Sequence, residues 1–174
     1  TIIKWFPKLP TIALLLITQI LSTPIALSGT KPTRVVSINL CTDQLLLQLA
    51  ERKNIASVTY LASDPIISYF ADRAVGIVKN RGLAEEILTL KPDLVLAGVF
   101  SSRPTTSLLK NLGYRVIEFE MADNFDALRS NLKKAGKALE EEEKASRLVT
   151  AFNSALSSFP QPKKILSALW GLYK

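Results

Sequence analysis

The sequence predicts an α/β fold, in which a three-layer lobe with a short, mostly parallel sheet flanked by helices is followed by a long connecting helix. Short runs rich in β-branched and aliphatic residues, typical of buried strands, recur along the chain at residues 34–38, 55–60, 94–97 and 114–119. Stretches with helix signals separate these runs. Strands that alternate with helices of this length are typical of a parallel sheet covered on both faces.

Local signals place the intervening helices. Asn39 or Thr42 can cap a helix after the first strand, and residues 45–50 supply its apolar face. Proline suits the first turn of a helix, so Pro65 predicts a short helix over residues 64–71. Two further helices are expected, one from Leu83 to Leu90 that Pro92 ends and one from Arg103 to Leu112 with Gly113 as its C-cap.

Helical spacing continues from residue 124 to 159 without a strand signal, through Phe125, Leu128 and Leu132 and later through Leu148 and Phe152. Gly136 and the acidic run at 140–143 predict a break between a shorter and a longer helix. The acidic run favours a helix N-terminus beginning near it, because carboxylates complement the positive end of the helix dipole. The prolines within 160–162 then punctuate the chain, and residues 163–170 are expected to form the first strand of a further lobe.

Residues 1–28 are expected to be a secretory signal peptide. Lys4 and Lys8 precede an apolar centre of about ten residues, and residues 26–28 offer a small-x-small cleavage site. The alternative is a membrane anchor, but the apolar centre is well short of the roughly 20 residues that span a bilayer. We therefore expect a periplasmic protein. Its single cysteine, Cys41, cannot form an internal disulfide and is expected to be buried.

Composition excludes several classes of function. The chain has no histidine, which removes the usual general base and the usual ligand of zinc and other transition metals, so no catalytic or metal site is expected. The 7 glycines form neither a dinucleotide fingerprint nor a phosphate loop. The net charge of +7 is scattered rather than interleaved with aromatic residues, so nucleic acid is not an expected partner.

The order of these segments resembles the cobalamin-, haem- and siderophore-binding proteins of ABC importers, whose two lobes are joined by a rigid helix. The resemblance runs from about Arg34 to Trp170 and is carried by the strand at 34–37, residues 83–88 leading into 90–95, and the Leu112-Gly113 turn. It implies an N-terminal lobe at 33–122, a connecting helical arm at 123–159 and the start of a truncated C-terminal lobe at 163–174.

The resemblance also implies a ligand held between the lobes by the loops that follow the parallel strands, where backbone groups and helix N-termini are free. The implied ligand-binding residues are Asn39, Cys41, Thr42, Tyr60, Asp64, Arg81, Phe100 and Arg103. Glu85 aligns with a glutamate that docks on arginines of the permease, a directional, charge-assisted pair.

Structural roles compete with these assignments. Tyr60 and Phe100 can pack in the core, Cys41 can be a small buried residue, and Arg81 and Arg103 can be surface cations. If both arginines face the cleft, an anionic ligand is favoured. Asp43 is interpreted as a first-turn helix carboxylate rather than a ligand contact, and Glu85 can simply lie on a solvated helix face.

The expected function is therefore non-catalytic: a monomeric solute-binding component of an ABC importer, without a resident cofactor, that delivers a metal chelate to a permease. Cobalamin, a ferric siderophore and haem remain open as ligands, and haem would rely on tyrosine because histidine is absent. Two alternatives stay open. They are a sensory or interaction domain of the same fold and a small α/β nucleotide-dependent enzyme.

Overall fold

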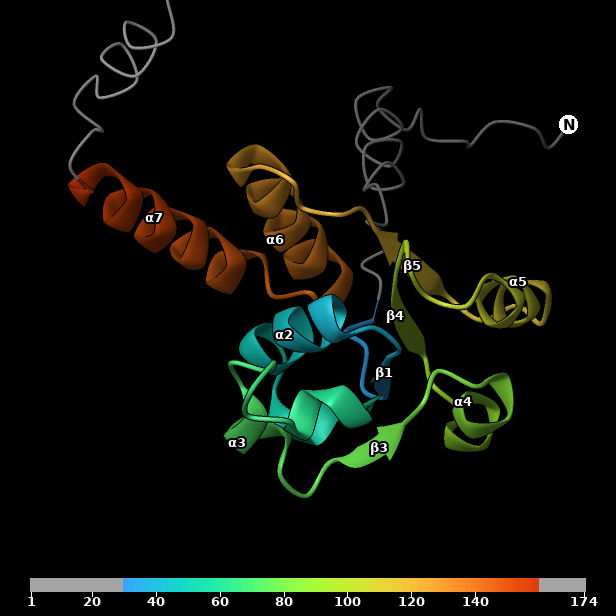
Figure 1. Cartoon of the computed structure of the whole chain (residues 1–174). Coiled ribbons are helices and arrows are strands. Elements are labelled where there is room, and N and C mark those ends of the chain that lie inside the picture. Colours follow the sequence, from blue (N-terminus) through green and yellow to red (C-terminus); the bar gives the residue numbers. More distant parts are fainter. Residues whose placement is uncertain (1–29, 160–174) are drawn as a thin grey trace, which may run out of the picture. The chain divides into compact units, whose positions relative to one another are not determined.

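The computed structural model describes residues 30–159, so the expected signal peptide at 1–28 and the expected strand at 163–170 lie outside the described part. Five strands form one sheet in the order β3-β2-β1-β4-β5, and each neighbouring pair is parallel (Figure 1). The strands are β1 (Val35–Ser37), β2 (Ile55–Thr59), β3 (Val78–Asn80), β4 (Leu94–Gly98) and β5 (Val116–Phe119).

Helices cover both faces of this sheet, as the sequence predicts. On one face α2 (Leu40–Leu49), α3 (Ala71–Ala74), α6 (Phe125–Leu139) and α7 (Glu142–Ser158) share a hydrophobic core with the sheet. On the other face lie α4 (Ala84–Leu90) and α5 (Arg103–Asn111), which bury Ile87 and Leu109 (Figure 1). Neighbouring residues of a strand point to opposite faces, so Val35 joins the first core and Val36 the second. The three-layer architecture is thus confirmed.

Two local predictions were wrong. The strand β3 was not predicted. It is the outermost strand of the sheet, has only three residues and includes Val78, which is 55% exposed, so the sequence shows no buried apolar run there. The helix expected over 64–71 is instead a series of turns followed by α3. The Asp64 carboxylate accepts a hydrogen bond from the Ile66 amide at 2.9 Å, and such a turn competes with helix formation. Two single-turn 3-10 helices, Arg52–Asn54 and Tyr60–Ser63, were also not predicted.

The expected break between a shorter and a longer helix is found between α6 and α7. Glu140 ends α6 in the left-handed region with φ of 55°, and α7 begins with Glu142 and Glu143 in its first turn. The two helices run antiparallel, because Arg129 Nε donates to Asn153 Oδ1 at 2.7 Å near one end while Gly136 meets Ala145 near the other. A Cβ atom on Gly136 would lie 2.5 Å from the Cβ of Ala145, so this glycine permits close packing of α6 and α7 rather than breaking the helix.

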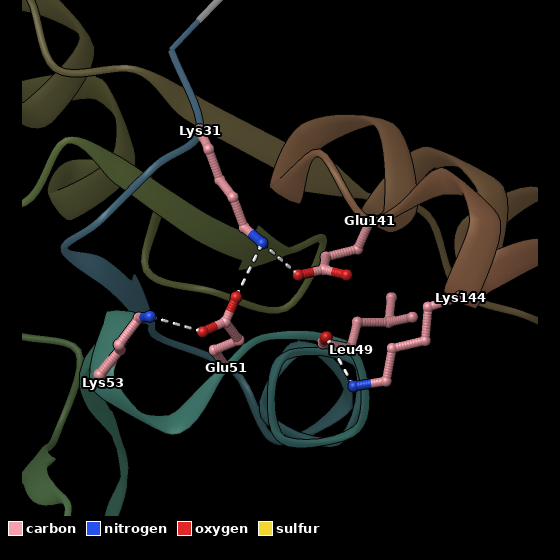
Figure 2. Close-up of polar contacts among 6 residues, drawn as sticks. All are labelled: Lys31, Leu49, Glu51, Lys53, Glu141 and Lys144. Atoms are coloured by element: carbon pink, nitrogen blue, oxygen red, sulfur yellow. Dashed lines mark hydrogen bonds and ion pairs between the residues drawn. The ribbon is translucent and has the colours of Figure 1, made fainter.

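Polar contacts tie the start of α7 to the rest of the lobe (Figure 2). Lys31 Nζ bridges Glu141 at 2.6 Å and Glu51 at 3.1 Å, and Lys53 Nζ lies 2.8 Å from the other oxygen of Glu51. Lys144 Nζ donates to the carbonyl of Leu49, the last residue of α2, at 2.9 Å. The hydrogen bond to Glu141 raises the pKa of Lys31, and the hydrogen bond from Lys53 lowers that of Glu51.

Within residues 30–159, none of the helices combines the length and the hydropathy needed to cross a membrane.

Candidate functional site

A cavity of about 500 Å³ lies where β1, β4 and β5 end. Because the sheet is parallel, all five strands end at one edge, which we call the carboxyl edge. The first turn of α2 and the segments after β4 and β5 form one side of the cavity, and α6 and α7 form the other. Its lining residues are Asn39, Cys41, Thr42, Gln44, Leu45, Gln48, Gly98, Val99, Phe100, Phe119, Glu120, Met121, Ala122, Leu128, Asn131, Leu132, Leu148 and Phe152.

The first turn of α2 is held rigidly at this edge. Asn39 caps the helix, since its Oδ1 accepts a hydrogen bond from the Cys41 amide at 2.9 Å. The hydroxyl of the fully buried Thr42 lies 2.7 Å from that of Ser37, at the end of β1. Gly98 lets this turn approach β4, because a Cβ there would lie 2.8 Å from Cγ of Asn39. Asn39 and Thr42 therefore position the wall of the cavity as well as lining it.

Cys41 and Phe100 present their side chains at the cavity. The expectation that Cys41 is buried was wrong, since the thiol is exposed on the part of α2 that faces the cavity rather than the sheet. Phe100 follows β4 and is 78% exposed, so it does not belong to the core. The Ser101 hydroxyl accepts a hydrogen bond from the Gly98 amide at 3.0 Å, which closes the turn that carries Phe100.

The other four predicted ligand residues do not line this cavity. Tyr60 follows β2 and is 56% exposed, and Asp64 closes the turn described above. Arg81 and Arg103 are both exposed, and the amide of Arg81 donates to Oε2 of Glu86 at 2.6 Å. The structure thus brings together Asn39, Cys41, Thr42 and Phe100, and leaves the two arginines outside the cavity.

Sequence reasoning missed the walls that come from β5, α6 and α7. Residues 120–122 follow β5 and lie at the same end of the sheet as the residues predicted after β1 and β4, so the position after a strand is the signal that could have identified them. Leu128, Leu148 and Phe152 have the helical spacing typical of core residues, and nothing in the sequence distinguishes a cavity wall from a core. Their position follows from the antiparallel packing of α6 and α7.

Asp43 is a buried carboxylate beneath the site. It is fully inaccessible to solvent, and its Oδ1 accepts a hydrogen bond from the Thr59 amide at 3.1 Å while the Thr59 hydroxyl donates to Oδ2. Burial raises the pKa of Asp43 to about 6, although the hydrogen bonds from Thr59 oppose this shift. Asp43 therefore joins the first turn of α2 to the end of β2. The interpretation as a first-turn carboxylate was correct in position but missed this contact.

Glu85 lies in the first turn of α4, exposed to solvent, and forms no ion pair or side-chain hydrogen bond among residues 30–159. Its neighbour Glu86 is engaged with the amide of Arg81. The two glutamates therefore differ, because a backbone amide holds the carboxylate of Glu86, whereas that of Glu85 has no partner among the described residues. In the described part of the chain, no three histidine, cysteine or acidic residues are grouped as a metal site.

The chain matches one protein family and one curated relative. The family described as periplasmic binding protein matches residues 35–161. An uncharacterized ABC transporter substrate-binding lipoprotein, YvrC of Bacillus subtilis, is 31% identical over 86 residues, which cover 48% of this chain and 27% of that protein.

Solved structures share the fold. A possible iron-binding, periplasmic solute-binding protein of Staphylococcus epidermidis has a TM-score of 0.64 at 24% identity, covering 77% of this chain and 54% of the other. A periplasmic heme-binding protein of Pseudomonas aeruginosa has a TM-score of 0.60 at 24% identity, with coverages of 72% and 45%. The vitamin B12-binding protein BtuF of Vibrio cholerae has a TM-score of 0.60 at 19% identity, with coverages of 73% and 49%. The chain thus spans about half the length of these structures and about a quarter of the curated relative.

Proposed function

The chain belongs to the periplasmic binding protein family, and we propose that it acts, without catalysis, as the solute-binding component of an ABC importer. In this proposal residues 1–28 direct export to the periplasm, and the division into a lobe at 33–122, an arm at 123–159 and the start of a second lobe at 163–174 is retained. The observation that carries the proposal is the cavity at the carboxyl edge, where Asn39, Cys41, Thr42 and Phe100 converge.

A metal chelate such as cobalamin, haem or a ferric siderophore is the proposed ligand. Two of the structural neighbours are a heme-binding protein and a vitamin B12-binding protein. Support from this chain comes from the size of the cavity, about 500 Å³, and from the exposed aromatic ring of Phe100 beside it. An aromatic ring stacks on the flat face of a macrocycle and contributes a large contact area.

Phe100→Ala is the variant that tests this site. We expect ligand affinity to fall about tenfold or more, because an exposed aromatic residue at the mouth of the cavity is a typical binding hot spot. Titrations with haemin, cyanocobalamin and ferrioxamine, followed by absorbance and calorimetry, measure the effect. Leu112→Ala is the matched control, since Leu112 is 54% exposed at the end of α5 and lies outside the cavity. Equal affinity of the two variants for a ligand that the parent protein binds would contradict the site.

Glu85 is proposed to dock on a permease. We expect Glu85→Ala to lower ligand uptake severalfold in cells with the cognate permease while ligand affinity stays unchanged, because the carboxylate is exposed and lies outside the cavity. Glu142→Ala is the matched control, an exposed glutamate in the first turn of a different helix. A loss of affinity as large as the loss of uptake would contradict the docking role.

A further inference from the structure

The cavity at the carboxyl edge carries almost no charge. Among its lining residues only Cys41 and Glu120 are ionisable, and no lysine or arginine lines it. Most of the wall is apolar, with the rings of Phe100 and Phe119 on the strand side and Phe152 on α7. An anionic group placed here would lose hydration without gaining a cation.

The polar side chains of the wall are largely engaged with the protein itself. Oδ1 of Asn39 accepts from the Cys41 amide, and the Thr42 hydroxyl donates to the Asn39 carbonyl at 2.9 Å. Gln44 donates to Ser68 Oγ at 3.0 Å, and Asn131 Nδ2 donates to the Glu120 carbonyl at 2.8 Å. These contacts hold the wall in place, and the hydrogen-bonding groups that remain, such as Nδ2 of Asn39 and Oδ1 of Asn131, are uncharged amides.

Two cations that lie close to aromatic rings of the lining are engaged with other partners. Arg129 pairs with Asp126 at 2.7 Å and lies 5.4 Å from the ring centre of Phe152, so it supports that ring without lining the cavity. Lys134 donates to the Glu118 carbonyl and lies 5.3 Å from the ring centre of Phe119. A cation therefore lies close to each of two lining aromatic rings without lining the cavity itself. The charged residue among those that line the cavity is Glu120.

We infer that the cavity binds an uncharged, predominantly apolar group of the ligand and discriminates against anionic groups. This inference rests on the proposed function, because it takes the carboxyl edge as the ligand site. It adds the chemistry of the ligand group that enters the cavity. An anionic ligand was favoured only if Arg81 and Arg103 both face the site, and neither of them lines this cavity.

A matched pair of fluorescent dyes tests the discrimination in the 174-residue chain. N-phenyl-naphthylamine is neutral, and anilinonaphthalene sulfonate carries the same rings with one added sulfonate. We expect the neutral dye to bind about tenfold more tightly, because the sulfonate must be desolvated against apolar walls beside Glu120. Glu120→Gln should reduce the difference in affinity between the two dyes. The reduction should be clearest at low salt, because the carboxylate is exposed and salt screens its repulsion of the sulfonate. Equal or tighter binding of the sulfonated dye would overturn the inference.

Cys41 allows the dye to be located. It is the only cysteine of the chain, it is exposed, and it lines the cavity. Alkylation with N-ethylmaleimide adds bulk at this wall and should weaken binding of the neutral dye severalfold. The same treatment should leave the dye affinity of Cys41→Ser equal to that of untreated Cys41→Ser. Bound dye should also slow alkylation of Cys41. Dye binding that is insensitive to alkylation would place the dye elsewhere and contradict the inference.

The same measurements separate this inference from the proposed function. If haemin, cyanocobalamin or ferrioxamine binds and none of them slows alkylation of Cys41, solute capture stands and the cavity is not its site, which overturns the inference. If the neutral dye behaves as expected and none of the three chelates binds, the chemistry of the cavity is supported and the metal-chelate function fails.

Discussion

The two edges of the parallel sheet use their polar and exposed residues in different ways. We call the edge where the strands begin the amino edge. Its charged groups form hydrogen bonds and ion pairs within the protein. Asp93 accepts hydrogen bonds from the amides of Thr33 at 2.6 Å and Arg34 at 3.0 Å, and Lys31 joins Glu51 to Glu141. At the carboxyl edge, exposed groups such as Phe100 and Cys41 surround a cavity.

This contrast separates stability from binding. Charged residues at the amino edge fix the start of β1 and the junction of α6 and α7, so their loss should affect folding. Exposed residues at the carboxyl edge make few contacts within the protein, so their loss should affect binding. Open α/β sheets in general place ligands at the carboxyl ends of their strands. Asp43 is an exception, because it belongs to the carboxyl edge and is nevertheless fully buried.

The largest effect is expected for Asp43→Asn as a function of pH. Burial raises the folded-state pKa from 3.8 to about 6, so the stability that protonated Asp43 contributes is complete below pH 3.8 and is lost as the pH rises through 6. Asparagine keeps the amide contact to Thr59 and does not ionise. The free energy of unfolding of the parent chain should therefore fall relative to the variant by about 2 kcal/mol between pH 4 and pH 7.5.

Urea titrations of both proteins at pH 4 and pH 7.5 measure this difference. Lys79 on β3 is a positively charged group that lowers the pKa of Asp43 and so opposes the effect of burial. A stability difference that does not change with pH would show that Asp43 does not titrate in this range.

A smaller effect is expected for Asp93→Ala at the amino edge. The variant leaves the amides of Thr33 and Arg34 without their carboxylate partner. Because these groups are exposed and water can replace the carboxylate, the free energy of unfolding should fall by about 1 kcal/mol. Denaturant unfolding measures the loss, and Asp72→Ala, which removes an exposed carboxylate from α3, serves as the control. Unchanged stability of Asp93→Ala would contradict the structural role of this edge.

The smallest effect is expected for Lys31→Ala. Lys31 pairs with Glu141 and Glu51, and its side chain is 37% exposed; ion pairs that reach solvent contribute little to stability because solvent and salt screen them. We expect a decrease of the unfolding temperature that is barely measurable at low salt and disappears at high salt. A large decrease that persists at high salt would show that Lys31 acts through packing rather than charge.

Most of the strands and helix ends could be predicted from the sequence, whereas the cavity could not, for physical reasons. Four strands, the Asn39 cap and the break before Glu142 are all encoded by nearby residues. The cavity is not, because its α6 and α7 walls depend on the close approach of Gly136 to Ala145, which no local pattern reveals. The exposure of Cys41 likewise depends on which side of α2 meets the sheet and which meets the cavity.

The central claim is that the carboxyl edge binds ligand while the amino edge maintains the fold. The most direct measurement compares Phe100→Ala with Asp93→Ala, using denaturant unfolding and titration with whichever of haemin, cyanocobalamin or ferrioxamine the parent chain binds. We expect Phe100→Ala to lose ligand affinity at unchanged stability and Asp93→Ala to lose stability at unchanged ligand affinity. Loss of affinity in Asp93→Ala without such a loss in Phe100→Ala would contradict it.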